Sequence, residues 1–224
     1  MEPRGAEGSE HPLKGSALAP PNERERLIAA MAMSCAERGY AATQVADVIA
    51  AARVTRESFD QSFASKSDCA LAAVGQILAE ITRVVASATT PDRTDWEKLI
   101  GAVRALLELM AARPSAARLA CGEARYENPP GAYALYESGI RILVAMLDRS
   151  RTYATASPPA SATRGAIGGA EALIRRELLA GRAERLPDLL PDIVYGLLVP
   201  YLDQQEALRY AELAREKVDK GGMG

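Results

Sequence analysis

The sequence predicts an all-α protein in which a small three-helix domain at the N-terminus precedes a larger helical domain. Alanine and arginine are abundant and aromatic residues make up only 5% of the chain, which favours helices because strands prefer β-branched and aromatic side chains. Apolar residues recur at the i, i+3, i+4 spacing of amphipathic helices. Proline, glycine and N-capping residues interrupt this spacing, so the pattern indicates a series of helices joined by short connections.

Four helices are expected in the N-terminal part, after a polar tail at residues 1–20. Asn22 and Glu25 are placed to cap the first helix, and Gly39 is suited to end it because glycine tolerates a positive φ. The run Ser65-Lys66-Ser67-Asp68 is typical of a helix start. The expected helices and their N-cap residues are 23–38 after Asn22, 44–52 after Thr43, 56–62 after Thr55, and 66–88 after Ser65.

The remainder of the chain is expected to be helical up to a short C-terminal tail. Pro114 suits the first turn of a helix, and Pro200 is expected to kink the last helix. The expected helices are about 95–112, 114–124, 131–154, 162–181 and 187–217. The predicted organisation is a tail at 1–20, a three-helix domain at 21–70, a helical domain at 71–217 and a flexible tail at 218–224.

The composition limits the classes of protein that the chain can belong to. Its 224 residues are 48% hydrophobic, which is enough for a sizeable core. The net charge is −2, and residues 22–75 hold six basic and seven acidic side chains. Charge alone therefore gives no indication of nucleic-acid binding.

Cysteine and histidine content argues against disulfides and metal sites. Cys35, Cys69 and Cys121 lie far apart in the sequence and are odd in number, which is typical of reduced thiols in the cytoplasm. His11, the only histidine, lies in the polar tail, so we expect neither a Cys/His metal site nor a cofactor. We find no apolar signal core and no run of 18 apolar residues, and we therefore expect a cytoplasmic protein with no membrane association.

The second and third expected helices form a helix-turn-helix. A very short turn at Arg53-Val54 joins them, and such a turn sets two helices at a steep angle, so that the second one projects from the surface. A projecting helix of this kind fits the major groove of DNA. Helix starts at Thr43 and Thr55 would present free N–H groups to phosphates.

The segment from Arg26 to about Ala73 resembles the TetR family of bacterial repressors. The matching stretches, in the order and spacing of the family pattern, are Arg26-Leu27-Ile28-Ala29-Ala30, Arg38-Gly39-Tyr40, Thr43-Gln44-Val45, Ala50-Ala51-Ala52-Arg53-Val54-Thr55-Arg56, Ser58-Phe59 and Phe63-Ala64-Ser65-Lys66-Ser67-Asp68. The spacing also places Phe59 and Phe63 in the core of the domain.

The resemblance implies a role for individual residues in binding double-stranded operator DNA. Thr43 and Lys66 would hold the DNA backbone, and Thr55 would cap the recognition helix and contact phosphate. The residues that would face the groove are Arg56, Glu57, Ser58 and Gln61, where arginine reads guanine and glutamine reads adenine.

Three positions depart from the family pattern. Arg53 stands where glycine is usual in the turn, so the arginine either accepts strain or the turn differs. Asp60 stands where a tyrosine commonly contacts phosphate, and Ser62 replaces a common histidine. A carboxylate at position 60 would repel phosphate, which lowers the expected affinity for DNA.

For the rest of the chain, the resemblance implies a helical domain that binds a small-molecule effector and pairs two subunits into a homodimer. The candidate ligand-binding residues are Trp96, Met110, Tyr126, Tyr133, Tyr136 and Met146, and the alternative for each is an ordinary core position. The candidate dimer interface is Leu190, Ile193, Val194, Leu197, Leu198 and Tyr201. The alternative for this apolar stretch is a central helix buried inside one subunit.

Three functions are compared. An enzyme is not expected, because the sequence has one histidine in a tail, no glycine-rich phosphate loop and no G-x-S-x-G motif. The favoured function is a transcriptional regulator, a repressor that releases its operator when a small apolar or aromatic molecule binds, although activation in place of repression stays open. The remaining alternative is a ligand-binding dimer of the same fold with weak or lost DNA binding.

Overall fold

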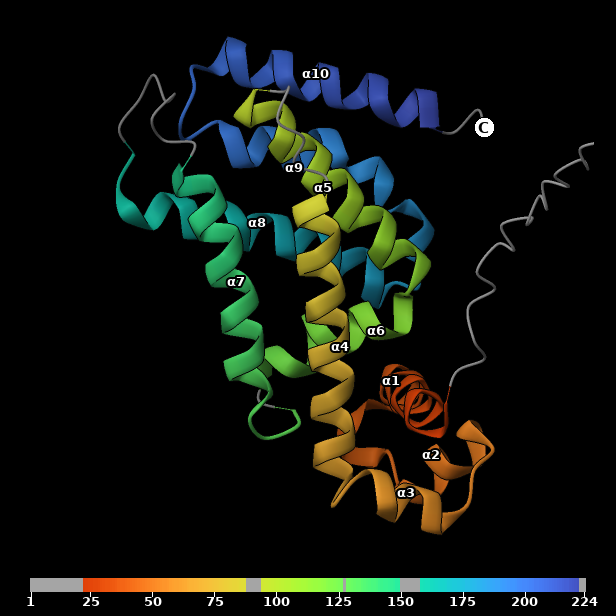
Figure 1. Cartoon of the computed structure of the whole chain (residues 1–224). Helices are drawn as coiled ribbons and strands as arrows, with labels where there is room; N and C mark the ends of the chain where they lie inside the picture. The colour runs from red at the N-terminus through yellow and green to blue at the C-terminus, as the bar shows by residue number, and fades with distance from the viewer. Residues whose placement is uncertain (1–21, 88–93, 127, 150–157, 222–224) are drawn as a thin grey trace, which may run out of the picture.

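A computed structural model describes residues 22–87, 94–126, 128–149 and 158–221 of the chain. The regular secondary structure of these residues is entirely helical, which confirms the predicted fold class. In Figure 1, α2 and α3 lie at one end of the molecule and α10 at the other. The elements in chain order are α1 (Glu23–Ala42), α2 (Val45–Ala52), α3 (Arg56–Ser62), α4 (Lys66–Ser87), α5 (Asp95–Ala112), α6 (Pro114–Arg118), the π-helical turn η1 (Leu119–Glu123), the 3₁₀ turn η2 (Ala124–Tyr126), α7 (Ala132–Arg149), α8 (Ala160–Leu179), the 3₁₀ turns η4 (Ala183–Arg185) and η5 (Pro187–Leu189), α9 (Leu190–Leu198) and α10 (Gln204–Gly221).

The N-terminal helices are capped and packed much as the sequence predicts. Asn22 and Glu25 form a reciprocal pair, in which each side chain accepts a hydrogen bond from the other residue's backbone N–H, at 2.9 and 3.0 Å. Thr55 Oγ1 accepts a backbone N–H of the first turn of α3 at 3.1 Å. The rings of Phe59 and Phe63 are buried with their centroids 5.9 Å apart, which confirms their predicted place in the core.

The connection from α1 to α2 corrects the predicted N-cap at Thr43. The helix α1 continues past a kink at Gly39, where φ is +80°, and Thr43 is the C-cap of α1. The Thr43 hydroxyl donates to the Gly39 carbonyl at 2.8 Å. The N-cap of α2 is Gln44, whose backbone N–H donates to the Asp47 carboxylate at 2.9 Å. Because glycine alone adopts such backbone angles easily, the extra turn after Gly39 moves the cap by one residue.

Arg53 occupies the turn between α2 and α3 in the left-handed conformation, with φ +54° and ψ +50°. The backbone N–H groups of Arg53 and Val54 donate to the carbonyls of Ala50 and Ile49 at 3.2 and 3.3 Å, which closes the C-terminal end of α2. The turn therefore has the left-handed conformation for which the family pattern usually has glycine. Arg53 adopts this conformation with strain, which costs an L-residue about 1–2 kcal/mol.

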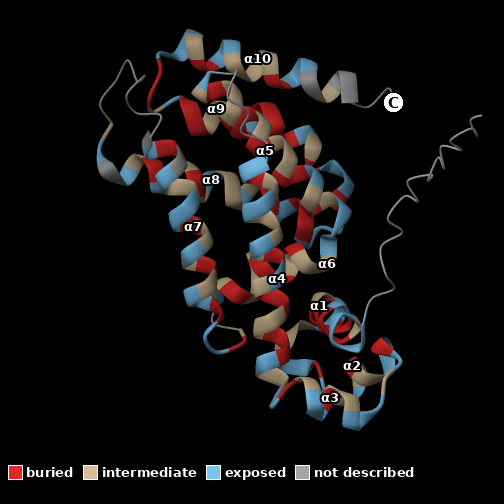
Figure 2. Cartoon of the chain, viewed as in Figure 1, coloured by how far each residue is buried: buried red, intermediate tan, exposed pale blue. Residues whose placement is uncertain are grey.

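The helix α4 connects the two halves of the molecule. It packs against α1 at one end and against α5 and α7 further along. Among the described residues, α4 is the helix that is long and apolar enough to cross a membrane by length and composition. Its apolar side chains Val74, Ile77 and Val85 are buried inside the protein, and Figure 2 shows buried residues along the faces where α4 meets its neighbours.

The C-terminal helices correct two further predictions. The expected single helix from 187 to 217 is divided into η5, α9 and α10. The α9 helix ends at Leu198, shortly before Pro200, which lacks a backbone N–H and whose ring blocks continuation of the helix. The α9 helix packs against α5, α8 and α10, so its wide apolar surface is covered by the same chain. The residues predicted as a dimer interface are all buried in this way: Leu190, Ile193, Val194, Leu197, Leu198 and Tyr201. For α9, the alternative of a central helix within one subunit holds.

The end of α8 is fixed by a buried carboxylate. Glu177 is 4% exposed and accepts hydrogen bonds from Arg182 Nε at 2.8 Å and Arg176 Nε at 2.9 Å. The Arg182 hydrogen bond, followed by that of Arg176, lowers the Glu177 pKa from 4.5 to about 2. Gly181 follows the helix with φ +74°, as the sequence predicts for its C-terminal end.

Replacing Arg53 by glycine should stabilise the protein. The left-handed backbone costs arginine about 1–2 kcal/mol, and the greater freedom of glycine in the unfolded chain offsets about 0.4–1 kcal/mol of the gain. We expect Arg53→Gly to raise the free energy of unfolding by up to about 1.6 kcal/mol in urea denaturation. Arg53→Ala is the control, since alanine keeps the Cβ and should give no gain. Equal effects of the two variants would contradict the strain.

Replacing Glu177 by glutamine should reduce the acid sensitivity of the fold. Because the folded-state pKa of Glu177 lies below its ordinary value, the ionised carboxylate stabilises the protein above about pH 4.5, and this contribution is lost as the pH falls towards about 2. We expect Glu177→Gln to lower stability at pH 7 and to flatten the loss of stability over this range. Glu108→Gln, at an exposed pair with Arg104, should leave the pH profile unchanged.

Candidate functional site

The exposed side of α3 carries the residues predicted to face DNA. Arg56, Glu57 and Gln61 are exposed, and Ser58 is half-buried. These side chains are paired along the helix. Arg56 Nε lies 3.0 Å from both carboxylate oxygens of Asp60, and Gln61 Nε2 donates to Glu57 Oε1 at 3.2 Å.

The hydroxyls of Thr55 and Ser58 complete this pairing, with their oxygens 2.9 Å apart. The polar side chains on the exposed side of α3 are thus paired with one another in this structure. The charge of Arg56 is directed at Asp60 on the same helix. Asp60 is one of the three residues that depart from the family pattern. DNA contact through Arg56 would require this exposed pair to exchange its partner for a base or a phosphate.

Two residues predicted to hold the DNA backbone, Thr43 and Lys66, have structural roles in this conformation. Thr43 is 0% exposed, so its side chain is closed off from a phosphate in this conformation. Lys66 Nζ donates to the carbonyls of Tyr40 and Thr43, both at 3.0 Å, and lies 4.2 Å from the centroid of the Tyr40 ring. The lysine therefore fixes the start of α4 to the end of α1. This use follows from the backbone carbonyls left open at the end of α1, which the sequence pattern does not show.

Other basic side chains of the N-terminal domain are also paired with carboxylates. Arg38 lies 3.3 Å from Asp47, and Arg26 lies 3.5 Å from Glu23. Arg26 Nε also donates to the Ala52 carbonyl at 3.2 Å, which holds α2 against α1. The similar numbers of basic and acidic residues in this domain thus allow several of its arginines to pair with carboxylates on the surface.

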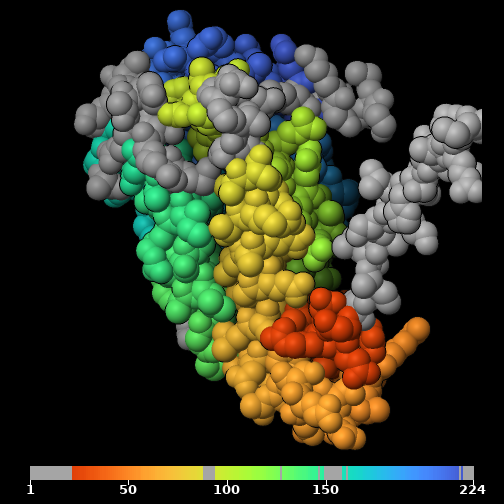
Figure 3. Space-filling model, in the orientation of Figure 1, coloured from red at the N-terminus to blue at the C-terminus, as the bar shows by residue number. Residues whose placement is uncertain are grey.

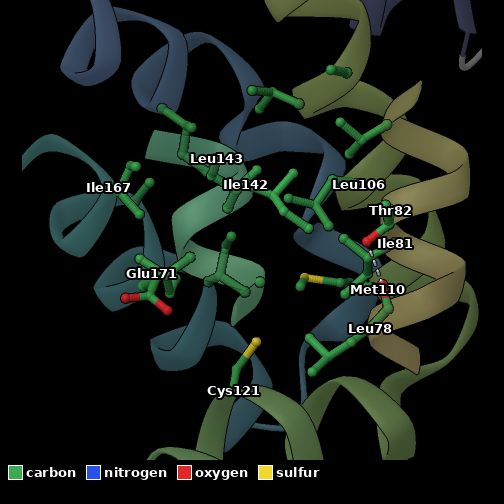
Figure 4. A pocket seen from close by; sticks show the side chains of 18 of the residues that line it. Leu78, Ile81, Thr82, Leu106, Met110, Cys121, Ile142, Leu143, Ile167 and Glu171 are labelled. Atoms are coloured by element: carbon green, nitrogen blue, oxygen red, sulfur yellow. Dashed lines mark hydrogen bonds between the residues drawn. The ribbon is translucent and has the colours of Figure 1, made fainter. Parts of the chain in front are cut away.

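A second candidate site is an apolar cavity of about 110 Å³ in the larger domain. Its walls come from α4, α5, η1, α7, α8 and α9, and α4 and α7 lie side by side over it on the molecular surface (Figure 3). Figure 4 shows Leu78, Ile81 and Thr82 of α4 on one side and Ile167 and Glu171 of α8 on the other. Besides these five, the lining residues are Val85, Leu99, Ala102, Val103, Leu106, Met110, Ala120, Cys121, Tyr136, Gly139, Ile140, Ile142, Leu143, Leu147, Ala170, Ile174, Ile193 and Leu197.

Polar groups are few in the cavity wall. The Tyr136 hydroxyl donates to Glu171 Oε1 at 2.6 Å, and the Thr82 hydroxyl donates to the Leu78 carbonyl of its own helix at 2.9 Å. Burial raises the pKa of the Cys121 thiol to about 12, with a further contribution from the negative charge of Glu171. The thiol is therefore protonated at neutral pH and is a poor nucleophile.

The six predicted ligand-binding residues lie in different places. Met110 and Tyr136 line the cavity. Trp96 is a core residue whose ring lies 6.2 Å from that of Tyr201, while Tyr126 and Tyr133 are 66% and 43% exposed. The side chain of Met146 lies outside the described residues.

Most cavity residues that the sequence prediction missed are aliphatic. They lie on the inner faces of α4, α5, α7 and α8. The apolar periodicity of these helices identified the inner faces, and only the packing of six elements together shows where a space is left between them.

Comparison with known proteins relates the N-terminal domain to a described family. Residues 27–73 match the family described as bacterial regulatory proteins, tetR family. Residues 27–73 therefore form an N-terminal domain of the tetR family type. This match covers the helix-turn-helix and the first turns of α4, and no curated protein matches the chain.

Solved structures of TetR-like proteins share the fold over nearly their whole length. The fatty acid degradation regulator FadR from Bacillus halodurans is 18% identical, with a TM-score of 0.69 over 81% of this chain and 96% of that one. A tetR regulator from Streptomyces fradiae, tylp, is 20% identical, with a TM-score of 0.64 over 90% and 98%. A gamma-butyrolactone receptor, described as ArpA-like, is 18% identical, with a TM-score of 0.63 over 88% and 97%. At these identities the likeness establishes the TetR fold.

Replacing Lys66 by methionine should destabilise the TetR-type N-terminal domain. The variant removes two charge-assisted hydrogen bonds to backbone carbonyls, each of which typically contributes about 1.5–3 kcal/mol. We expect Lys66→Met to lower the free energy of unfolding by about 2 kcal/mol or more in urea denaturation. Lys98→Met is the control, because half-buried Lys98 pairs with the Asp95 carboxylate at 3.2 Å in place of two backbone carbonyls, and its removal should lower the free energy of unfolding less than that of Lys66. A similar small effect at Lys66 would contradict its role at the end of α1.

Proposed function

We propose that this TetR-family regulator is a ligand-responsive repressor whose homodimer binds an operator and releases it when a small apolar molecule enters the cavity. One observation carries the proposal: α4 connects the DNA-binding domain to the cavity. Its first residue, Lys66, is bonded to the end of α1, while Leu78, Ile81 and Val85 line the cavity further along the same helix. A ligand that displaces the second part of α4 therefore displaces the anchor of the DNA-binding domain.

A second contact between the cavity and the DNA-binding domain supports this coupling. Ala120 and Cys121 line the cavity within the π-helical turn η1, and α1 packs against both α6 and η1. A Cβ built at Gly39 would lie 3.5 Å from Glu123 Oε1 at the end of η1. Because π-helical turns are strained and often occur at functional positions, η1 is suited to change its winding when the cavity fills.

The dimer requires a surface other than the buried face of α9. The outer face of α8 offers one, because Gly165 and Gly169 are exposed and a Cβ at either would meet nothing within 4 Å. Leu179 on the same helix is 73% exposed. Small residues beside an exposed leucine allow a helix of a second subunit to approach closely, and two-fold symmetry would place two α3 helices roughly 34–36 Å apart.

The cytoplasmic location and the absence of catalytic activity follow from this proposal. Buried thiols at Cys35 and Cys69 suit a reducing compartment. The cavity places a carboxylate, a phenol and a protonated thiol in an apolar wall, a set that binds but holds no activated nucleophile or base.

The test selects binding sites for the full-length protein from random double-stranded DNA and measures affinity by fluorescence anisotropy at several salt concentrations. Enrichment of a palindrome with steep salt dependence supports the regulator. A dimer that binds no DNA at low salt would instead support the alternative of a ligand-binding protein that has lost DNA binding. Addition of benzyl alcohol, a probe with one ring, should then release the selected DNA.

Replacing Asp60 by asparagine should strengthen DNA binding. The variant removes a negative charge from the recognition helix and frees Arg56 from its ion pair. We expect Asp60→Asn to lower Kd for the selected DNA about tenfold at low salt, which corresponds to about 1.4 kcal/mol. Glu212→Gln on the exposed side of α10 changes the net charge equally and should have little effect. If both variants change Kd alike, the effect is one of overall charge.

Replacing Gly169 by arginine should produce a monomer. The site is open, so the fold of one chain accommodates the side chain, whereas a partner helix packed on α8 would be displaced. We expect light scattering to report a dimer for the wild type and a monomer for Gly169→Arg, with unchanged helical content by circular dichroism. Gln205→Arg, on exposed α10, is the comparison. A dimer in both variants would place the interface elsewhere.

A further inference from the structure

The charge of the cavity wall restricts the ligands that it can take. Among the described residues that line the cavity, Glu171 is the charged one, and lysine, arginine and histidine are absent. The rest of the wall is apolar apart from a few hydroxyl and thiol groups. An anion placed here would lose its hydration, and the arginines that act on the wall from outside it, Arg125 near Tyr136 and Arg175 near Cys121, do not line the cavity. Burial of an anion without a direct cationic partner is strongly unfavourable in an apolar environment.

Glu171 is half-buried and lies on α8 at the edge of the apolar wall (Figure 4). It accepts the Tyr136 hydroxyl at 2.6 Å. A carboxylate offers about four acceptor positions, so this bond leaves acceptor capacity on the side chain. Burial and the bond to Glu171 raise the Tyr136 pKa, so the phenol keeps its proton and its position. Tyr136 thus holds the carboxylate in one orientation beside the cavity.

The size of the cavity limits the ligand further. An enclosed apolar cavity of about 150 Å³ holds benzene, and the present cavity measures about 110 Å³. Its contents are therefore of the order of one ring or a short branched chain, unless α4 or α7 moves. A ligand of this size has room for few polar groups, and Glu171 is the charged side chain among the described residues of the wall.

We propose that the cavity selects compact apolar molecules that present a hydrogen-bond donor, a protonated amine or a hydroxyl, to the Glu171 carboxylate, and rejects carboxylates of the same size. This selectivity rests on the proposed function in one respect, namely that the cavity is the effector site. It goes further by assigning the chemical class of the effector and the residue that determines it. The preference arises from the charge of the ligand's polar group, because ligands with the same ring make the same contacts with the apolar wall.

The experiment titrates three seven-carbon probes into the full-length protein at pH 7 by calorimetry, without DNA: benzylamine, benzyl alcohol and benzoate. We expect benzylamine and benzyl alcohol to bind at least about tenfold more tightly than benzoate. In Glu171→Gln, benzylamine should lose about tenfold in affinity, and benzoate should bind more tightly than to the wild type. Glu212→Gln, remote from the cavity, should bind all three probes as the wild type does.

Tyr136→Phe separates a direct role of Glu171 from a merely structural one. This variant removes the hydroxyl bound to Glu171 and leaves the carboxylate in place, so the preference for donors over benzoate should persist. Equal loss of benzylamine binding in Tyr136→Phe and Glu171→Gln would overturn the proposal, as would wild-type binding of benzoate as tight as that of benzylamine. Failure of all three probes to bind would also overturn it.

These outcomes are independent of the selected DNA. A protein that binds the operator but shows no charge preference contradicts only the present inference. A protein that prefers donors but binds no operator contradicts the proposed function instead.

Discussion

The arrangement of the whole molecule depends on the burial of one helix, α4. Its apolar side chains contact α1 in the small domain and α5 and α7 in the large one, so the two domains share part of one continuous core. Lys66 adds a polar fixation at the start of this helix. Because close-packed interiors transmit strain, this shared core is the physical basis of the coupling that we propose between the cavity and the DNA-binding domain.

The recognition helix shows a balance between internal order and availability for a partner. Its exposed polar side chains are satisfied by one another, which stabilises a short helix that would be marginal alone. The same pairs compete with any phosphate or base. A family pattern with an aromatic residue in place of Asp60 lacks this competing carboxylate, and in the present chain Asp60 makes the exposed side of α3 less cationic.

The sequence was sufficient for much of the fold because local signals agreed with the tertiary structure. Asn22 and Thr55 each cap a helix as predicted, and the proline and glycine positions marked most helix ends to within a few residues. The capping prediction failed at Thr43, where a kink at Gly39 added a turn.

The positions that could not be predicted depend on contacts between distant segments. The apolar pattern of α9 is the same whether the helix packs against a partner or against its own subunit. Only the positions of the neighbouring helices α5, α8 and α10 distinguish the two cases. The ligand-site predictions selected large aromatic residues. The cavity is formed mainly by medium-sized aliphatic side chains, since space is left where such side chains fail to meet.

The close contact of α7 with α4 at Gly139 has a consequence for how such a protein can change over time. A Cβ at this glycine would lie 3.2 Å from Leu78 Cδ2, and both residues line the cavity. Any larger residue at position 139 would reshape the binding space and push on α4 in one step. If the cavity is the effector site as proposed, a change of residue 139 would alter the ligand preference and the position of α4 together, and a chain that acquires a new effector would need a compensating change elsewhere along α4 to keep its operator.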